Sequence, residues 1–401
     1  MEIYFLFLLF SAPIFFGAAY PWAYFSLSGF LFLLVCFFPQ SLSEICVLPV
    51  FIRSGFLFVF GIIFFQSLFA PYHPYATQLE LLKWLAWAGV FLLIQLLPAS
   101  SLERLIIGLA VLGCLESLYG LWETGTGHEH VLWQKKQIHL GFVTGTYINR
   151  NHLAGLLELC LGVHIGFLLK AFRQKRFWVF TGGSLLLIPT LMGFFQTGSR
   201  MGFISFCLSL GALSFLLLRK LRRKIIGVFF LMLLFFLGIA LWMGRQKLLE
   251  RWEETVMNTE YWEGGRILVW ESAFRVLKDH PWLGTGLGNF EWVFPAYQPE
   301  RLGMGWAHAH NDYLELAVEL GVPAFAVLLL SFSGLGVFYF LKKISPEHAD
   351  SPLLWGIGLS LTSFAFHGLA DFNFAIPANA FIFIFLTAAL FRLTTPSKEG
   401  L

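Results

Sequence analysis

The segment FIRSGFLFVFGIIFFQSLF (51–69) contains a single charged residue, Arg53. As an α-helix with about 1.5 Å of rise per residue, it would extend about 28 Å, which matches the ~30 Å hydrocarbon core of a bilayer. Because so apolar a helix has no face suited to water, the segment predicts a transmembrane helix.

Comparable apolar runs recur along the whole chain. Of its 401 residues, 57% are hydrophobic and 13% charged, about half the charged fraction of a soluble protein. This composition excludes a soluble globular protein, and a net charge of +3 gives no reason to expect a nucleic acid partner. We therefore predict an all-α polytopic membrane protein with about twelve transmembrane helices. They are placed at 2–18, 21–38, 51–69, 79–97, 102–122, 153–170, 177–195, 200–218, 224–243, 316–341, 353–370 and 374–392.

Lysine and arginine residues in the short loops set the predicted orientation, since they are enriched on the cytoplasmic side. With the N-terminus inside, the outer short loops hold only Lys135, Lys136, Arg150 and Arg200. The inner loops and the C-terminal tail hold a much larger set, namely Arg53, Arg104, Lys170, Arg173, Lys175, Arg176, Arg219, Lys220, Arg222, Arg223, Lys224, Lys342, Lys343, Arg392 and Lys398. We expect both termini in the cytoplasm and the N-terminal segment retained as the first span.

Two polar segments interrupt the apolar runs, and both fall outside in this orientation. The shorter is 123–152, and the longer, 244–315, separates the helices of 1–243 from those of 316–401. Within the longer segment, apolar residues at helical spacing predict a helix from Arg266 to Leu277. The sequence GTGLGNF (284–290) follows, and we interpret it as a turn, because a nucleotide-binding loop needs a preceding strand and a following helix.

Five polar clusters stand out against the apolar background, and all five fall on the outer side. They are TGTYINRNHLAG (144–155), TGSRMG (197–202), GGRILVW (264–270), WAHAHNDYLELAVELG (306–321) and HGLADFN (367–373). Segments distant in the chain are therefore expected to form one aqueous site at the outer surface of the bilayer.

Three arginines in these clusters have two interpretations each. Arg200 either reaches the lipid headgroups or faces a cavity, where its planar guanidinium could hold two phosphate oxygens. Arg266 either forms a surface ion pair with Glu263 or Glu271 or binds an anion. For Arg150 the alternative to anion binding is an interfacial position beside Asn149 and Asn151, which would cap the next helix.

His310 is the candidate general base. It precedes a helix that Asn311 or Asp312 can cap, and the positive helix end disfavours an imidazolium ion. A purely structural histidine is the alternative. His308 and His310 form an HxH pair, as do His128 and His130, but neither pair has an accompanying carboxylate or cysteine set, and the five cysteines form no CxxC pair. We expect no metal, no disulfide framework and no cofactor.

Two pairs of titratable residues lie four positions apart on one helix face. Glu315 and Glu319 either line a cavity or face water, and the second interpretation is the simpler. His367 and Asp371 are predicted to form a structural pair near the membrane surface.

Taken together, these motifs resemble the O-antigen ligase and polymerase superfamily. The resemblance consists of an arginine at the outer end of a span (Arg200), an Arg-x-x-x-Trp helix in the largest external loop (266–270), and His310-Asn311 followed by Gly321 eleven residues after the histidine. The segment Asn-Arg-Asn-His-x-Ala-Gly (149–155) is also similar to one found among its members. By motif the resemblance covers about 145–325, and by topology it covers the whole chain.

The resemblance implies a multispanning C-class glycosyltransferase of the bacterial inner membrane. Its donor would be a glycan on undecaprenyl diphosphate, and its acceptor either lipid A-core or another lipid-linked chain. Transfer would need no metal and would invert the anomeric carbon. By position, Arg200 and Arg266, with Arg150 as a third candidate, would hold the diphosphate, and His310 would activate the acceptor hydroxyl. His308, Asn149, Asn151, Asn311 and Asp371 would support them.

Val322, Pro323 and Ala324 follow Gly321, where ligases often carry Gly, Thr or Tyr three residues after the glycine. This departure leaves ligase and polymerase both open. A protein O-oligosaccharyltransferase of the same fold and a transporter of polysaccharide or lipid remain as alternatives. The transporter is the weaker one, because transporters place charges near the bilayer midplane, whereas the polar clusters here lie at the outer edge.

Overall fold

The computed structural model describes residues 1–69, 72–218, 238, 249, 259–303, 305–343 and 351–395. These residues are mostly helical, and one short antiparallel hairpin, β1 (His130–Val131) and β2 (Gln134–Lys135), lies in the 123–152 segment. The predicted ninth span, 224–243, lies outside the described residues except for Gly238. The all-α membrane architecture predicted from composition is confirmed.

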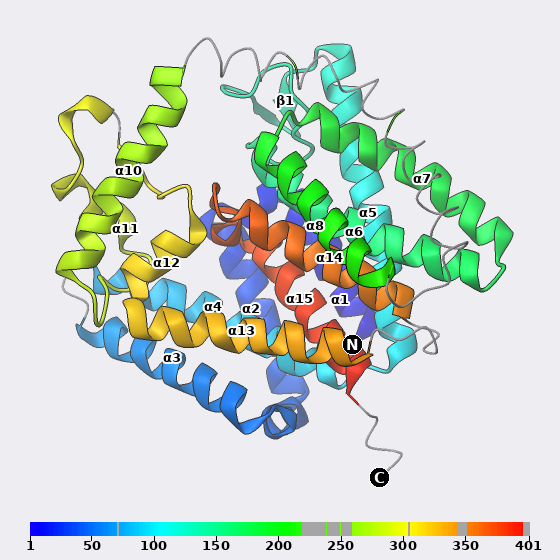
Figure 1. Cartoon of the computed structure of the whole chain (residues 1–401), viewed down its shortest axis with the longest axis horizontal. Coiled ribbons are helices and arrows are strands. Elements are labelled where there is room, and N and C mark those ends of the chain that lie inside the picture. Colours follow the sequence, from blue (N-terminus) through cyan, green and yellow to red (C-terminus); the bar gives the residue numbers. More distant parts are fainter. Residues whose placement is uncertain are drawn as a thin grey trace.

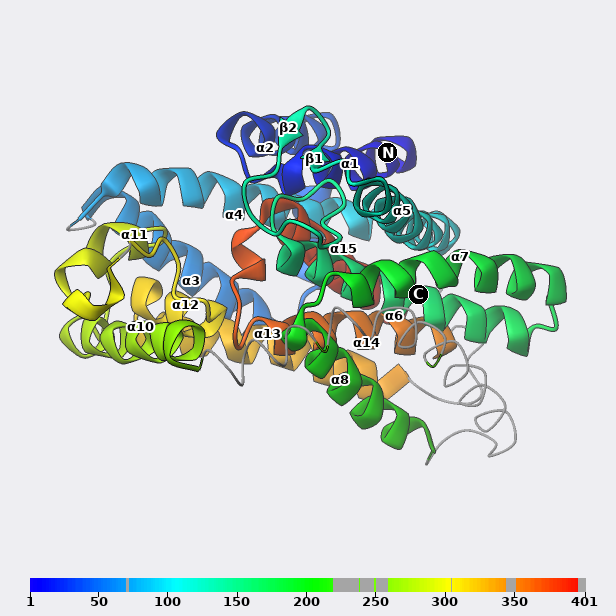
Figure 2. The ribbon, with the colours of Figure 1, turned by 90° about the horizontal axis from the view of Figure 1, so that it is seen from above.

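The long helices follow the predicted apolar runs within a few residues at most ends. They are α1 (Glu2–Ile14), α2 (Pro21–Phe37), α3 (Val50–Phe69), α4 (Pro74–Gln95), α5 (Ala99–Thr126), α6 (Arg150–Arg173), α7 (Phe177–Gln196), α8 (Arg200–Leu218), α13 (Val322–Lys343), α14 (Ser351–His367) and α15 (Pro377–Thr394). Short 3₁₀ helices η1 (Phe16–Ala18), η2 (Pro39–Val47) and η5 (Asn373–Ala375) join some of them. Most of these helices run along the long axis of the molecule (Figure 2).

Six of the described helices are long and apolar enough to cross a membrane, or seven if α2 and η2, bent by 88°, form one span. Several others, including α1 and the described parts of α8 and α13, are apolar but shorter. A polytopic membrane protein is therefore supported, whereas the count of twelve spans remains a prediction.

Helix α6 lies at the centre of the bundle, packed against α5, α7 and α14. Its approach to α14 depends on glycine: a Cβ atom on Gly166 would lie 2.7 Å from Gly356 Cα, and one on Gly162 would lie 2.4 Å from the backbone nitrogen of Ser360. Small residues allow membrane helices to pack backbone against backbone in this way. The close packing brings the middle of α6 beside the first half of α14.

The large polar segment folds into its own helical cluster at one end of the molecule (Figure 1). It comprises α10 (Thr259–Asp279), α11 (Phe290–Val293), η3 (Phe294–Ala296), η4 (Glu300–Leu302) and α12 (Asp312–Leu320). The predicted loop helix is confirmed as α10. An apolar core formed by Val269, Val276, Phe294 and Val318, among others, holds α10 against α11 and α12.

The predicted span 316–341 is wrong in its first turn, because the chain breaks at Gly321 between α12 and α13. Gly321 has a φ of 77°, and a Cβ atom there would lie 2.4 Å from the carbonyl oxygen of Trp282. The GTGLG turn packs against this break, with Thr285 and Gly286 donating backbone hydrogen bonds to the carbonyl oxygens of Val318 and Glu319. As a result, α12 belongs to the polar cluster and α13 starts the next apolar helix.

Candidate active site

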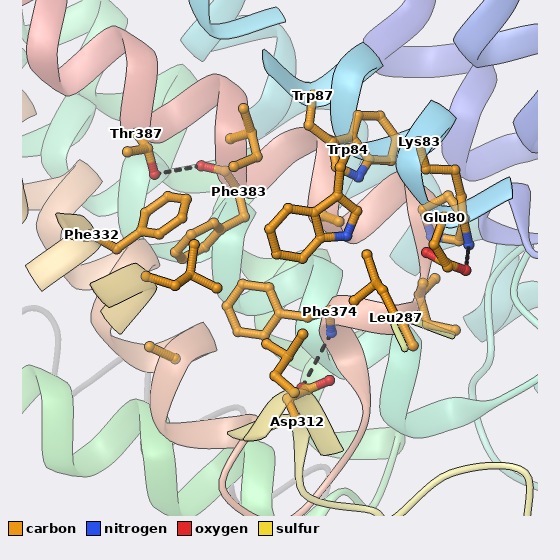
Figure 3. A pocket seen from close by; sticks show the side chains of 18 of the residues that line it. Glu80, Lys83, Trp84, Trp87, Leu287, Asp312, Phe332, Phe374, Phe383 and Thr387 are labelled. Carbon is orange, nitrogen blue, oxygen red and sulfur yellow. Dashed lines mark hydrogen bonds and ion pairs between the residues drawn. The ribbon is translucent and has the colours of Figure 1, made fainter. Parts of the chain in front are cut away.

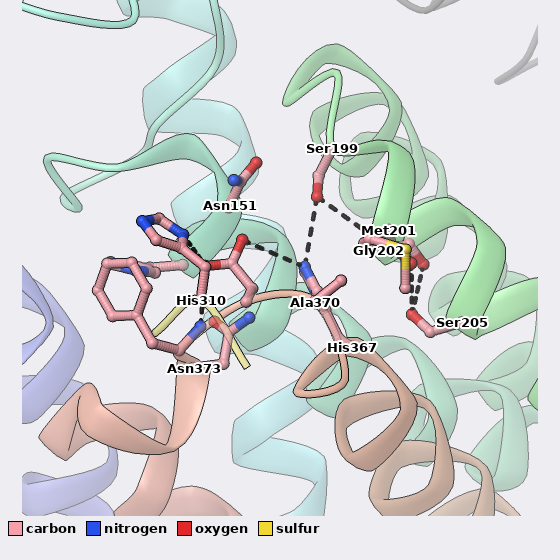
Figure 4. A network of polar contacts seen from close by, with 12 residues as sticks. Asn151, Ser199, Met201, Gly202, Ser205, His310, His367, Ala370 and Asn373 are labelled. Carbon is pink, nitrogen blue, oxygen red and sulfur yellow. Dashed lines mark hydrogen bonds and ion pairs between the residues drawn. The ribbon is translucent and has the colours of Figure 1, made fainter. Parts of the chain in front are cut away.

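The five polar segments meet where α6 and α8 begin, around the loop that joins α14 to α15 (Figure 4). Arg266 Nη1 on α10 donates a hydrogen bond of 2.9 Å to the carbonyl oxygen of Ala370. The backbone nitrogen of Asp312 donates to the carbonyl oxygens of Gly368 (2.9 Å) and Asp371 (3.2 Å). The 367–373 loop is therefore their common contact.

His310 directly precedes α12, with a φ of 51° that is uncommon for a residue other than glycine. The next residue, Asn311, caps α12 by accepting a hydrogen bond of 3.0 Å from the backbone nitrogen of Leu314. The His310 ring packs edge-on against Phe372 and Trp306, with centroids 4.7 and 5.3 Å away. Burial lowers the pKa of His310 to about 4, against the opposing effect of Asp371. The ring is therefore neutral near pH 7 and can accept a proton, with burial as the main cause.

Asp371 lies between two histidines. Its Oδ1 is 3.8 Å from His310 Nδ1, and its Oδ2 is 3.9 Å from His367 Nε2. Burial on its own would raise the pKa of Asp371, but the neighbouring histidines and Arg266 lower it below the usual range. An ionised carboxylate therefore faces the ring of the candidate base, and the predicted pairing of His367 with Asp371 is a close contact.

Behind His367 lies Glu158, a residue of α6 that the sequence interpretation overlooked. Its Oε2 is 2.8 Å from His367 Nδ1, and its Oε1 accepts hydrogen bonds from Ser205 (2.5 Å) and Ser363 (2.7 Å). Glu158 and His367 are both fully buried. A lone glutamate inside an apolar helix is costly to bury, and that cost is the signal that could have identified it.

The start of α8 lies beside His367. Ser199 Oγ is 3.5 Å from His367 Nε2, and a Cβ atom on Gly202 would lie 3.4 Å from His367 Cε1. Arg200, the first residue of α8, is half-buried next to this contact. The backbone of Arg200 therefore lies at the edge of the site, directly after Ser199.

The first turn of α6 is fixed by its asparagines and by Arg150. Asn149 caps the helix by accepting a hydrogen bond of 2.9 Å from the backbone nitrogen of Asn151. The Arg150 guanidinium is buried, lies 4.1 Å from the centre of the Phe142 ring and approaches the carbonyl oxygen of Thr197 at 3.5 Å. Asn151 lies beside the polar network (Figure 4), whereas Arg150 joins the 142–149 loop to the end of α7.

The two histidines of the HxH pair face different partners. His308 Nδ1 is 2.8 Å from Glu315 Oε1, and its ring stacks on Phe372 with centroids 4.3 Å apart. Burial opposes the charged form, but Glu315 outweighs it and raises the pKa of His308. Glu315 also accepts a hydrogen bond of 2.7 Å from the backbone nitrogen of Ala309. Phe372 thus lies between His308 and His310.

Glu315 and Glu319 are buried, so the simpler expectation that they face water is wrong. Glu315 holds the HxH loop, as described above, and Glu319 Oε1 accepts a hydrogen bond of 3.0 Å from the backbone nitrogen of Phe290. Both side chains line a cavity. Through the hydrogen bonds above, they also hold the HxH loop and the start of α11 against α12.

This cavity, of about 1200 Å³, lies between α3, α4, α13 and α15 and extends to the HxH loop (Figure 3). Its walls are mainly aromatic and aliphatic, with Trp84, Phe332 and Phe383 among them. Its charged and polar lining residues include Arg53 on α3, Glu80 and Lys83 on α4, Asn149 and His152 at the start of α6, His308 in the HxH loop, and Glu315 and Glu319 on α12. Phe372 lines the cavity and touches His310, so this ring separates the candidate base from the apolar space.

Comparison with known protein families connects this geometry to the sequence motifs. The family model described as O-antigen ligase (Wzy_C) matches residues 182–329, which run from α7 into α13 and include Arg200, Arg266 and His310. No curated protein matches the chain. The family expected from the motifs is therefore supported: residues 182–329 of this chain match the O-antigen ligase family.

Proposed function

We propose that the protein is a glycosyltransferase that moves a glycan from undecaprenyl diphosphate to an acceptor hydroxyl at the periplasmic face of the inner membrane. The family match supports a glycosyltransferase of the O-antigen ligase type acting on lipid-linked glycans. The observation that carries the proposal is a neutral, partly buried His310 between an ionised Asp371 and the end of a long apolar cavity. Water-soluble and lipid-soluble halves of one substrate can meet only at such a boundary.

In the proposed reaction, the acceptor hydroxyl gives its proton to His310 while its oxygen forms a bond to the anomeric carbon. The bond between that carbon and the diphosphate oxygen breaks, and the leaving diphosphate keeps the electron pair. A single displacement of this kind inverts the anomeric carbon. Asp371 stabilises the imidazolium that forms, because its carboxylate faces the second ring nitrogen.

Arg200 and Arg266 are the proposed diphosphate ligands. Their guanidinium groups would neutralise the charge that develops on the leaving group beside a low-dielectric wall, which needs no metal ion. Arg150 would contribute its positive charge to the diphosphate site from a greater distance, because its guanidinium is buried on the Phe142 ring. The polyprenyl tail would occupy the apolar cavity, with its polar end near Asn149 and His308.

The proposed topology keeps twelve spans with both termini in the cytoplasm, so that the α10–α12 cluster lies in the periplasm. The acceptor decides between ligase, polymerase and protein glycosylation. Deleting the gene and separating the glycans by gel distinguishes them: a ligase mutant accumulates long chains on the carrier, and a polymerase mutant retains single repeat units. Glycan lost from an exported protein instead would indicate protein glycosylation.

The direct test uses purified protein in nanodiscs with the lipid-linked donor and the acceptor. His310→Ala is expected to lower the transfer rate at least ~100-fold, the usual contribution of a general base. Arg200→Ala and Arg266→Ala should also abolish transfer. His128→Ala and Arg275→Ala, at exposed positions outside the site, serve as controls. Near-normal transfer by the His310 variant would refute the proposed base, and vesicle transport of the donor without transfer would favour a transporter.

A further inference from the structure

Four titratable side chains, two acids alternating with two histidines, form a line that runs from helix α6 to the candidate base. Glu158 is 2.8 Å from His367, His367 is 3.9 Å from Asp371, and Asp371 is 3.8 Å from His310. The four residues come from α6, from the end of α14, from the α14–α15 loop and from the HxH loop. Three of them, all except His310, are fully buried or nearly so.

Glu158 is held in a fixed position at the inner end of this line. Ser205 on α8 and Ser363 on α14 both donate hydrogen bonds to its Oε1, which leaves Oε2 directed at His367. Removing a carboxylate from water costs several kcal/mol unless it is paired and hydrogen-bonded. A buried acid with partners on two other helices therefore has a defined orientation, and the glycine contacts between α6 and α14 keep its distance to His367 short.

His367 has an acid at each ring nitrogen. Nδ1 faces Glu158, and Nε2 faces Asp371, with Ser199 Oγ at 3.5 Å as a further neighbour. An imidazole ring can donate to acceptors at both nitrogens only when it carries two protons. The geometry therefore suits an imidazolium, whose charge would offset that of Asp371.

We propose that Glu158 and His367 are positioning residues that act through Asp371 on His310. Glu158 holds His367 with a proton on each ring nitrogen, and His367 holds the Asp371 carboxylate toward His310 Nδ1. His310 then takes the acceptor's proton at Nε2, and Asp371 faces the Nδ1–H of the imidazolium. This inference rests on the proposed role of His310 as the base.

Other charged or titratable groups also face these four residues, and their charges influence the protonation of His310 and His367. Arg266 approaches from α10, His152 from α6, and Asp312 and Glu315 from α12, while His308 lies on the far side of Phe372. Glu158 hydrogen-bonds His367, Ser205 and Ser363, and the described structure shows no hydrogen bond between Glu158 and any of these other groups, so Glu158→Gln changes none of their bonds directly.

The test compares Glu158→Gln and His367→Gln with wild type in the nanodisc transfer assay. Each is expected to lower kcat about 10- to 100-fold, the loss typical when a partner that orients a functional histidine is removed, with the donor KM nearly unchanged. Glu158→Asp keeps the charge and should recover part of the rate. Glu103→Gln is the matched control, because Glu103 pairs with Lys170 at the opposite end of α6, away from the site. Wild-type kcat in both glutamine variants would overturn the proposal.

The pH profile separates positioning from a packing defect. Without Glu158, His367 is expected to lose its second proton. The Asp371 charge then acts on His310 without an opposing charge, and the acid limb of kcat/KM should move up by about one pH unit. A packing defect would lower kcat at every pH and leave the limb unmoved, which contradicts the proposal.

Nitrogen-15 NMR of labelled histidine provides a readout that does not depend on activity. The wild-type spectrum should contain an imidazolium signal near neutral pH that disappears in both Glu158→Gln and His367→Gln. If that signal is absent from wild type, the positioning proposal fails even when His310→Ala is inactive. If the signal is present but His310→Ala transfers glycan normally, the proposed function fails instead.

Discussion

Trp270 Nε1 donates a hydrogen bond of 2.9 Å to the carbonyl oxygen of Ala309, the residue between His308 and His310. Four residues earlier on the same face of α10, Arg266 bonds the carbonyl oxygen of Ala370. The Arg-x-x-x-Trp motif therefore fastens one helix to the two loops that carry His310 and Asp371. The spacing of the motif has a structural role in addition to any contact that Arg266 makes with a substrate.

Replacing Trp270 by Phe keeps most of the ring but removes the donor. The Ala309 carbonyl then loses its partner, at a cost of about 1–3 kcal/mol, and the HxH loop is less well held. We expect the transfer rate to fall about tenfold, since 1.4 kcal/mol corresponds to one decade, while the amount of folded protein in the membrane stays the same. Trp282→Phe, at a side chain that is 75% exposed, is the control. Equal rates for both variants would mean that the hydrogen bond does not organise the site.

The acidity of His310 predicts how the rate depends on pH. Because burial lowers its pKa to about 4, the free enzyme keeps its base unprotonated above about pH 5. The value of kcat/KM should therefore stay level from pH 8 to about 5 and fall as pH drops through about 4. A limb near pH 6.5, the value of an ordinary histidine, would show that the ring is exposed to water in the working enzyme.

Asp371→Asn is expected to move this limb in the opposite direction from Glu158→Gln. The Asp371 carboxylate raises the pKa of His310, so its removal makes the ring a weaker base and shifts the limb to lower pH. The maximal rate should also fall, because the imidazolium loses its counter-charge. Asp371→Glu, which retains the charge, is the matched variant. An upward shift in the asparagine variant would contradict the proposed contact between the two side chains.

The helices were predictable from sequence because membrane spans differ so strongly in composition from the loops. The run 51–69 became α3 (Val50–Phe69), and 177–195 became α7 (Phe177–Gln196), since their ends are set by polar and charged residues. The meeting of five polar segments could also be anticipated, because they share one side of the membrane. The side of the membrane on which each segment lies follows from hydropathy and loop charge, without knowledge of any long-range contact.

Three features could not be predicted because they depend on packing between distant residues. The break at Gly321 arises from backbone contact with Trp282, and nothing in the local apolar pattern signals it. Glu158 sits in an apolar run, and only its contacts with α8 and α14 give it a role. The position of the Arg150 guanidinium on the Phe142 ring and near the Thr197 carbonyl oxygen likewise depends on how the 142–149 loop packs against the end of α7.

Gly321→Ala tests whether the position eleven residues after His310 requires glycine for its backbone conformation and its contact with Trp282. At a φ of 77°, a Cβ atom would meet the Trp282 carbonyl oxygen at 2.4 Å, so the α12–α13 corner must open. We expect a loss of about 2 kcal/mol or more, from backbone strain and the clash together. Thermal unfolding followed by fluorescence-detected size exclusion measures it. Gly305→Ala, where a Cβ atom would meet no other atom within 4 Å, is the control, and equal unfolding midpoints would refute the argument.

The last prediction concerns the cavity. Ala88 on α4 lines it, so Ala88→Trp would fill part of the space assigned to the polyprenyl tail. If the tail binds there, the KM for the full-length donor should rise about tenfold, the equivalent of roughly two buried methylene groups. A donor with a tail of only two isoprene units should be affected far less, because it does not reach past the polar end. Leu82→Trp, on the same helix at a half-exposed position that does not line the cavity, controls for the added ring. If Ala88→Trp raises the KM for both donors equally, or for neither, the tail lies elsewhere, and the apolar walls around Trp84 and Phe383 serve only to pack α4 against α15.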